Sequence, residues 1–151
     1  MRIKTIKLIS LFGTLLLALS AVSVQAETPK RGGTLVWSIG TTPRHLNPAV
    51  QSGIATGAPG AQLFATLVRF DDKWNAHPYL AKSWQTSADG LAVTFNLVEG
   101  ATFHDGTPIT SKDVAFSIKT IKANHPFKTM FRAVSSVETP NANTVVFKLS
   151  Q

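Results

Sequence analysis

The sequence predicts an α+β fold in which antiparallel hairpins combine with two or three helices. Three observations support this class. Residues 91–97 alternate between apolar and mixed positions, residues 110–121 carry apolar side chains at helical spacing, and Asp-Gly pairs mark tight turns beside the strands. Period-two alternation is typical of a half-buried antiparallel strand, whereas spacing of three and four residues is typical of an amphipathic helix.

The N-terminus has the three parts of a secretory signal peptide. Arg2, Lys4 and Lys7 give a positive start, residues 8–19 are almost wholly apolar, and small and polar residues lead to Ala26. A membrane-spanning helix needs about 20 apolar residues, so this apolar core is short for an anchor. We expect cleavage after about Ala26, and the alternative is an anchor that is never cut.

The absence of cysteine and the distribution of charge indicate where the protein is located and which partners it has. The sequence has no cysteine, so it offers neither disulfides nor a lipidated cleavage site, and we expect a soluble periplasmic protein. Without the three basic residues of the leader, twelve basic and eight acidic residues remain, a net charge of +4. These charges are scattered, with no basic run, which argues against a nucleic-acid partner.

Four segments in the first half of the chain after the leader have patterns that predict local structure. Leucine, valine, tryptophan and isoleucine between glycines predict a strand over residues 34–39. Two prolines predict turns over residues 40–48, and the polar, glycine-rich residues 51–60 predict a loop. Apolar pairs four residues apart predict a helix over residues 61–69.

Strands and turns surround one helix in the second half. Residues 91–97 form the clearest strand, and Asp89-Gly90 supplies the turn before it. Thr110 and Asp113 resemble a capping box that begins a helix, which Asn124 and Pro126 end. Further strands are expected at residues 101–103, 134–138 and 144–149, the last two joined by a turn at residues 140–143.

The most suggestive enzymatic fragment is His104-Asp105-Gly106. An exported hydrolase could use His104 and Asp105 for proton transfer, but the same residues form a tight turn, and we prefer that interpretation. The four histidines are dispersed, whereas zinc needs three or four converging ligands, and the pair Asp71-Asp72 fits a solvated turn better than a cation site. There is no Gly-x-Ser-x-Gly motif and no cysteine nucleophile. We therefore expect no catalytic residue, no metal site and no cofactor.

A set of separated motifs is far more specific than these fragments. They are PYLAKSW at residues 78–84, ADG at 88–90, VTFNL at 93–97, FHDGTP at 103–108 and TSKDVAFS at 110–117. In this order and spacing the chain resembles the family 5 extracellular solute-binding proteins, which are peptide, dipeptide and nickel receptors of ABC importers. The resemblance extends from Gly33 to Leu149 and covers nearly all of the chain after the leader.

The resemblance implies the two-lobed fold of a type II periplasmic binding protein, of which this chain would be the N-terminal portion. Residues 27–50 would supply the first strand and turn of the large lobe, and residues 51–151 a truncated small subdomain. The segment after Asn47-Pro48 would face the solute. Its candidate ligand-binding residues are Gln51, Ser52, Gly53 and Ile54, where a glycine lets the backbone approach the solute closely.

The implied function is the periplasmic substrate-binding component of an ABC importer. It would capture oligopeptides or similar small solutes as a monomer, by closure of two lobes, and deliver them to a permease in the inner membrane. Family members are several hundred residues long, so we expect a partial chain. A non-functional gene fragment is the second alternative.

Overall fold

The computed structural model describes residues 31–150, so the leader predicted at residues 1–26 lies outside the described part. Residues 31–39 form neither helix nor strand, and the side chains of Leu35 and Val36 are almost fully exposed. The strand predicted over residues 34–39 is therefore wrong for this chain. A strand is held by hydrogen bonds to a neighbour, and none of the described strands pairs with this segment. Residues 31–37 also belong to a different unit from all elements described below.

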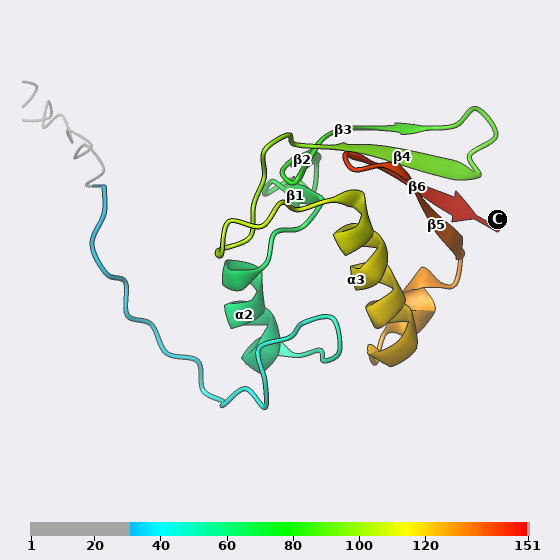
Figure 1. The fold of residues 1–151 in the computed structure, drawn as a ribbon. Coiled ribbons are helices and arrows are strands. Elements are labelled where there is room, and N and C mark those ends of the chain that lie inside the picture. Colours follow the sequence, from blue (N-terminus) through cyan, green and yellow to red (C-terminus); the bar gives the residue numbers. More distant parts are fainter. Residues whose placement is uncertain (1–30, 151) are drawn as a thin grey trace, which may run out of the picture. The chain divides into compact units, whose positions relative to one another are not determined.

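The centre of the second unit is an antiparallel sheet of four strands (Figure 1). Its strands are β3 (Ala81–Thr86), β4 (Ala92–Leu97), β5 (Val134–Asn141) and β6 (Thr144–Leu149), in the spatial order β3-β4-β6-β5. Two of the neighbouring pairs are hairpins, and β4 pairs with β6 across the long connection that contains the helix. With two α-helices and only antiparallel strands in residues 31–150, the predicted α+β class is confirmed.

The register of the sheet confirms the alternation predicted for residues 91–97. Phe95 pairs with Trp84 on one side and with Val145 on the other, so all three side chains share one face. On that face the rings of Trp84 and Phe95 lie 6.5 Å apart, and those of Phe95 and Phe147 lie 5.3 Å apart. The opposite face carries mostly polar side chains, including the hydrogen-bonded pair Asn96 and Ser83.

Helix α3 (Ser111–Asn124) covers the β5 and β6 part of the apolar face (Figure 1). Its Val114 joins Leu97 and Val145 in the buried core, where Leu97 is 1% and Val145 is 0% exposed. At the other end of the helix, the ammonium group of Lys122 donates a hydrogen bond to the carbonyl oxygen of Val134. Helix and sheet are thus joined by apolar burial in the middle and by a polar contact at one end.

The start of α3 follows the prediction and adds one contact. The carboxylate of Asp113 accepts hydrogen bonds from the backbone N–H and the hydroxyl of Thr110, at 2.7 and 2.9 Å. Ser111, which is 1% exposed, donates its hydroxyl to the carbonyl oxygen of Asn141 at 2.5 Å. The helix begins at the predicted residue, and Ser111 ties it to the β5–β6 turn.

Three features of the second half of the chain differ from the prediction. The brief strand expected at residues 101–103 is only an isolated bridge between Thr102 and Pro108. Strand β5 continues to Asn141, so the turn is shorter than residues 140–143. Pro140 is tolerated because β5 lies at the edge of the sheet and its pairing with β6 is irregular between Glu138 and Asn141. A short 3-10 helix, η1 (Lys128–Phe131), connects α3 to β5.

The helix predicted over residues 61–69 is wrong. Helix α2 (Ile54–Leu63) ends before most of this segment, and β1 (Val68–Phe70) forms a small hairpin with β2 (Ala76–Pro78). Leu67, one of the apolar residues that suggested a helix, instead packs against the core of the sheet. Its carbonyl oxygen accepts a hydrogen bond from the backbone N–H of Ala81 at 2.9 Å. Tertiary contacts therefore override the local pattern.

Asp71 organises the turn of the β1–β2 hairpin. Its carboxylate accepts hydrogen bonds from the backbone N–H groups of Lys73 and Asn75, from the Asn75 side chain, and from His77 Nε2 at 3.0 Å. The hydrogen bond from His77, followed by those from Asn75, lowers the pKa of Asp71 from 3.8 to about 2. The same turn places Trp74 at φ 62°, a rare backbone conformation for a bulky side chain.

This network predicts an acid-sensitive hairpin. A carboxylate whose pKa is lower in the folded state contributes stability above its unfolded pKa, and that contribution is lost as the pH falls through the folded value. We expect the turn to loosen between pH 3.8 and about 2, as reported by the NMR signal of the Trp74 indole N–H. The Asp71→Asn variant should lack this transition. A variant that keeps the wild-type acid transition would contradict the assignment to Asp71.

Candidate functional site

The four predicted ligand-binding residues lie together at the start of α2. Gln51 and Ser52 are half-buried residues of the preceding loop, Gly53 is the N-cap, and Ile54 is the first helical residue, with 67% of its surface exposed. The sequence predicted a loop over residues 51–60, and this is wrong from Ile54 onward. Glycines and Pro59 within the helix masked the helical pattern.

Gly53 has a backbone conformation that requires glycine. Its φ is 98° and its ψ is 158°, a region that residues with a Cβ atom rarely adopt. A Cβ built on Gly53 would meet no other atom within 4 Å, so the constraint is conformational and not steric. This turn lets the chain enter α2 with the backbone of Gly53 exposed.

The helix start offers backbone donors. The first N–H groups of an α-helix have no partner within the helix, and those of Ile54, Ala55 and Thr56 occupy these positions. Gly53 is the N-cap and has no side chain that could accept a hydrogen bond from these N–H groups. The first turn of α2 also contains no acidic residue. Such a helix start can donate hydrogen bonds to a carbonyl or carboxylate group.

The loop before the helix is fixed by hydrogen bonds of its own. Thr56 is fully buried and donates its hydroxyl to the carbonyl oxygen of His45 at 3.2 Å. The Asn47 side-chain oxygen accepts the backbone N–H of Ala49 at 2.9 Å, and the Asn47 N–H donates to His45 Nδ1 at 3.2 Å. Residues 45–49 therefore form an ordered turn attached to α2.

Close packing completes this attachment. Gly60 lies one helical turn after Thr56 and is also buried, and a Cβ built on it would lie 2.9 Å from Pro48 Cγ. The helix can approach Pro48 this closely only because position 60 has no side chain. Neither Thr56 nor Gly60 was predicted from the sequence as a packing residue. Their spacing of four residues, with small side chains, is the signal that could have identified a buried helix face.

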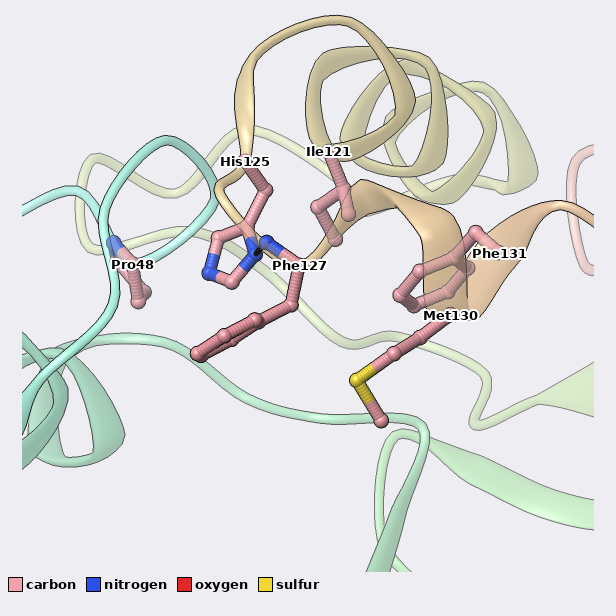
Figure 2. Close-up of a pocket in the computed structure, with 6 residues that line it drawn as sticks. All are labelled: Pro48, Ile121, His125, Phe127, Met130 and Phe131. Atoms are coloured by element: carbon pink, nitrogen blue, oxygen red, sulfur yellow. Dashed lines mark hydrogen bonds between the residues drawn. The ribbon is translucent and has the colours of Figure 1, made fainter.

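A shallow apolar pocket adjoins the same turn (Figure 2). Its volume is about 150 Å³, and it lies between Pro48, the last turn of α3 and η1. Figure 2 shows the aromatic and aliphatic side chains that surround it, which are Pro48, Ile121, His125, Phe127, Met130 and Phe131. Pro48 is thus shared between the packing of α2 and the wall of this pocket.

His104 and Asp105 lie in a tight turn that the Asp105 carboxylate stabilises. The Asp105 carboxylate accepts hydrogen bonds from the backbone N–H of Thr107 at 3.0 Å and from its hydroxyl at 2.7 Å, and these bonds lower the pKa of Asp105. His104 is exposed, and Gly106 has the positive φ of a tight turn, 85°. Within residues 31–150 no three acidic or histidine side chains gather as a metal site. The predicted turn is confirmed.

The second half of the chain, which contains the sequence motifs at residues 78–117, matches a protein-family model. Residues 75–151 match the model of the bacterial extracellular solute-binding proteins, family 5, middle part. The chain belongs to this family. The match includes the four-stranded sheet and α3, and it confirms the resemblance that the sequence motifs indicated.

Relatives and solved structures agree with the family. A Brucella ovis protein assigned as an ABC transporter peptide-binding protein is 42% identical over 111 residues, covering 71% of this chain and 20% of its own length. The dipeptide-binding protein of Escherichia coli is 29% identical over 161 residues, covering 92% of this chain and 30% of its own length. The ABC transporter substrate-binding protein CtaP of Listeria monocytogenes matches with a TM-score of 0.71 and 32% identity, over 81% of this chain and 26% of CtaP.

The chain spans about a fifth to a third of the length of these relatives. All three are named as binding proteins. In residues 31–150 every helix is too short or too polar to cross a lipid bilayer.

Proposed function

We propose that this chain supplies part of the periplasmic substrate-binding component of an ABC importer for peptides or similar small solutes. The observation that carries the proposal is the family match over residues 75–151, and the motifs of residues 78–117 support it. In this function the protein captures a solute and releases it to a permease of the inner membrane, and no bond is made or broken. The protein acts as a monomer and needs no cofactor.

The solute contact is proposed at Gln51, Ser52, Gly53 and Ile54. Three features support this placement. Gly53 is exposed, the first N–H groups of α2 have no partner within the helix and suit a peptide carbonyl or carboxylate, and the turn at residues 45–49 holds the segment in place. Peptides are proposed as the solute class because two of the three relatives described above are named for binding peptides or dipeptides.

Export is proposed to precede function. The basic start, the short apolar segment and Ala26 suit a signal peptide that is removed in the periplasm, leaving a chain that begins at Glu27. N-terminal sequencing of the protein recovered from the periplasm of a bacterial host should begin at or near Glu27. A chain that keeps Met1 and sediments with membranes would support the uncut anchor instead.

A segment exchange tests the proposed function. The part of the E. coli dipeptide-binding protein that aligns with residues 38–150 is replaced by these residues, and dipeptide affinity is measured by titration calorimetry. We expect the chimera to bind dipeptides within about tenfold of the parent, a loss of about 1.4 kcal/mol at most, because the two proteins align over this segment and residues 51–54 are proposed to contact the solute in both. A folded chimera that binds no dipeptide would contradict the proposal.

A further inference from the structure

Met130 lies in an unusual chemical position. The sequence contains two methionines, Met1 and Met130, and no cysteine, so Met130 carries the only sulfur atom after the start of the leader. It belongs to η1, and 79% of its surface is exposed. Figure 2 shows its thioether at the end of an extended side chain at the edge of the apolar pocket.

We propose that Met130 is a modification site for oxidants of the peroxide class, and that its oxidation makes the edge of this pocket polar. Thioethers are among the side chains that peroxides oxidise most readily, and susceptibility increases with exposure. This inference rests on the proposed periplasmic location, where the protein would meet such oxidants without the cytoplasmic reductants. Within residues 31–150, Met130 is the sulfur-containing side chain that such an oxidant can reach.

The reaction is a two-electron oxygen transfer. A lone pair of the Met130 sulfur attacks one oxygen of hydrogen peroxide, the O–O bond breaks, and a proton moves to the departing oxygen. The products are methionine sulfoxide and one water molecule. A dithiol reductant reverses the step by taking the oxygen as water and becoming a disulfide, so the modification is reversible.

The surroundings of Met130 explain why the change matters. The pocket is lined almost entirely by carbon, from Pro48, Ile121, Phe127 and Phe131, and only His125 adds a polar side chain. A sulfoxide places a strong hydrogen-bond acceptor at this apolar edge, where it favours water over apolar contact. Oxidation therefore lowers the affinity of the pocket for any apolar group.

Oxidation kinetics test the accessibility of the site. The full chain is treated with excess hydrogen peroxide, and peptide mapping by mass spectrometry follows oxygen addition at Met130 separately from Met1. Because the side chain is 79% exposed, oxidation in the folded chain should be within about fivefold of the rate in the urea-unfolded chain. Slower oxidation than this in the folded chain, with the fold verified by circular dichroism, would overturn the proposal.

A dye experiment tests the effect on the pocket. Fluorescence of an anilinonaphthalene sulfonate dye, which binds exposed apolar surface, is measured before and after peroxide treatment. The wild-type chain should lose fluorescence on oxidation, and Met130→Leu, a substitution of similar volume, should not. Equal losses in the two proteins, or no loss in the wild type, would overturn the proposed change in the pocket.

Discussion

The Leu97→Ala variant is expected to lose about 2–5 kcal/mol of unfolding free energy. Leu97 is 1% exposed and packs with Val114 of α3 and Val145 of β6, so it joins the helix to the middle of the sheet. Its removal takes away buried apolar contact and leaves a cavity that a rigid sheet cannot fill. The unfolding free energy of a small domain is only about 5–15 kcal/mol, so this loss would remove a large share of it.

Urea unfolding followed by tryptophan fluorescence measures this loss. The matched control is Leu91→Ala, the same chemical change beside the same strand at a residue that is 43% exposed. The control should cost less, about 1 kcal/mol, because Leu91 buries much less of its surface than Leu97 does. Similar losses for the two variants would show that Leu97 does not hold the core together.

The Gly60→Ala variant is expected to destabilise the attachment of α2 by about 1–3 kcal/mol. The added Cβ would lie 2.9 to 3.1 Å from three ring carbons of Pro48, so either the helix or the turn must move. A proline ring cannot rotate away as a long flexible side chain can. The effect is local, so hydrogen exchange of the α2 amides, including Phe64 N–H, should reveal it most clearly.

Gly57 provides the opposite outcome in the same helix. A Cβ built on Gly57 meets no atom within 4 Å, and alanine is a better helix former than glycine. Gly57→Ala should therefore slow exchange of the same amides, through a gain of about 0.5–1 kcal/mol. If Gly60→Ala slowed exchange as much as Gly57→Ala, close packing of Gly60 on Pro48 would not be what holds α2 in place.

The sequence predicted those parts of the fold whose local pattern agrees with their tertiary contacts. Strand β4 alternates in sequence because Phe95 and Leu97 belong to the apolar core on one face, whereas Asn96 on the other face hydrogen-bonds to Ser83. Helix α3 has a capping residue, an apolar stripe and a proline after its end, so its start and end were predicted correctly. The family followed from motifs in this same region.

The sequence could not predict the region that carries the candidate site. In α2, Pro59 and the glycines oppose helix formation, and the helix forms because Thr56 and Gly60 pack onto the turn at residues 45–49. Residues 34–39 have the composition of a strand, but a strand forms only with a partner, and composition does not supply one. The position of Gln51, Ser52, Gly53 and Ile54 at the solute was implied by family resemblance alone and remains a proposal.

The most direct test of the proposed solute contact is dipeptide affinity of the segment-exchange chimera with and without a change at Gly53. Gly53→Val is compared with Gly90→Val, since both glycines have positive φ, 98° and 72°, and open space around them, but Gly90 lies in the β3–β4 turn. We expect Gly53→Val to raise the dissociation constant at least about tenfold and Gly90→Val to leave it within about twofold. An unchanged dissociation constant for Gly53→Val, or equal increases in the two variants, would contradict the assignment of this segment to solute binding.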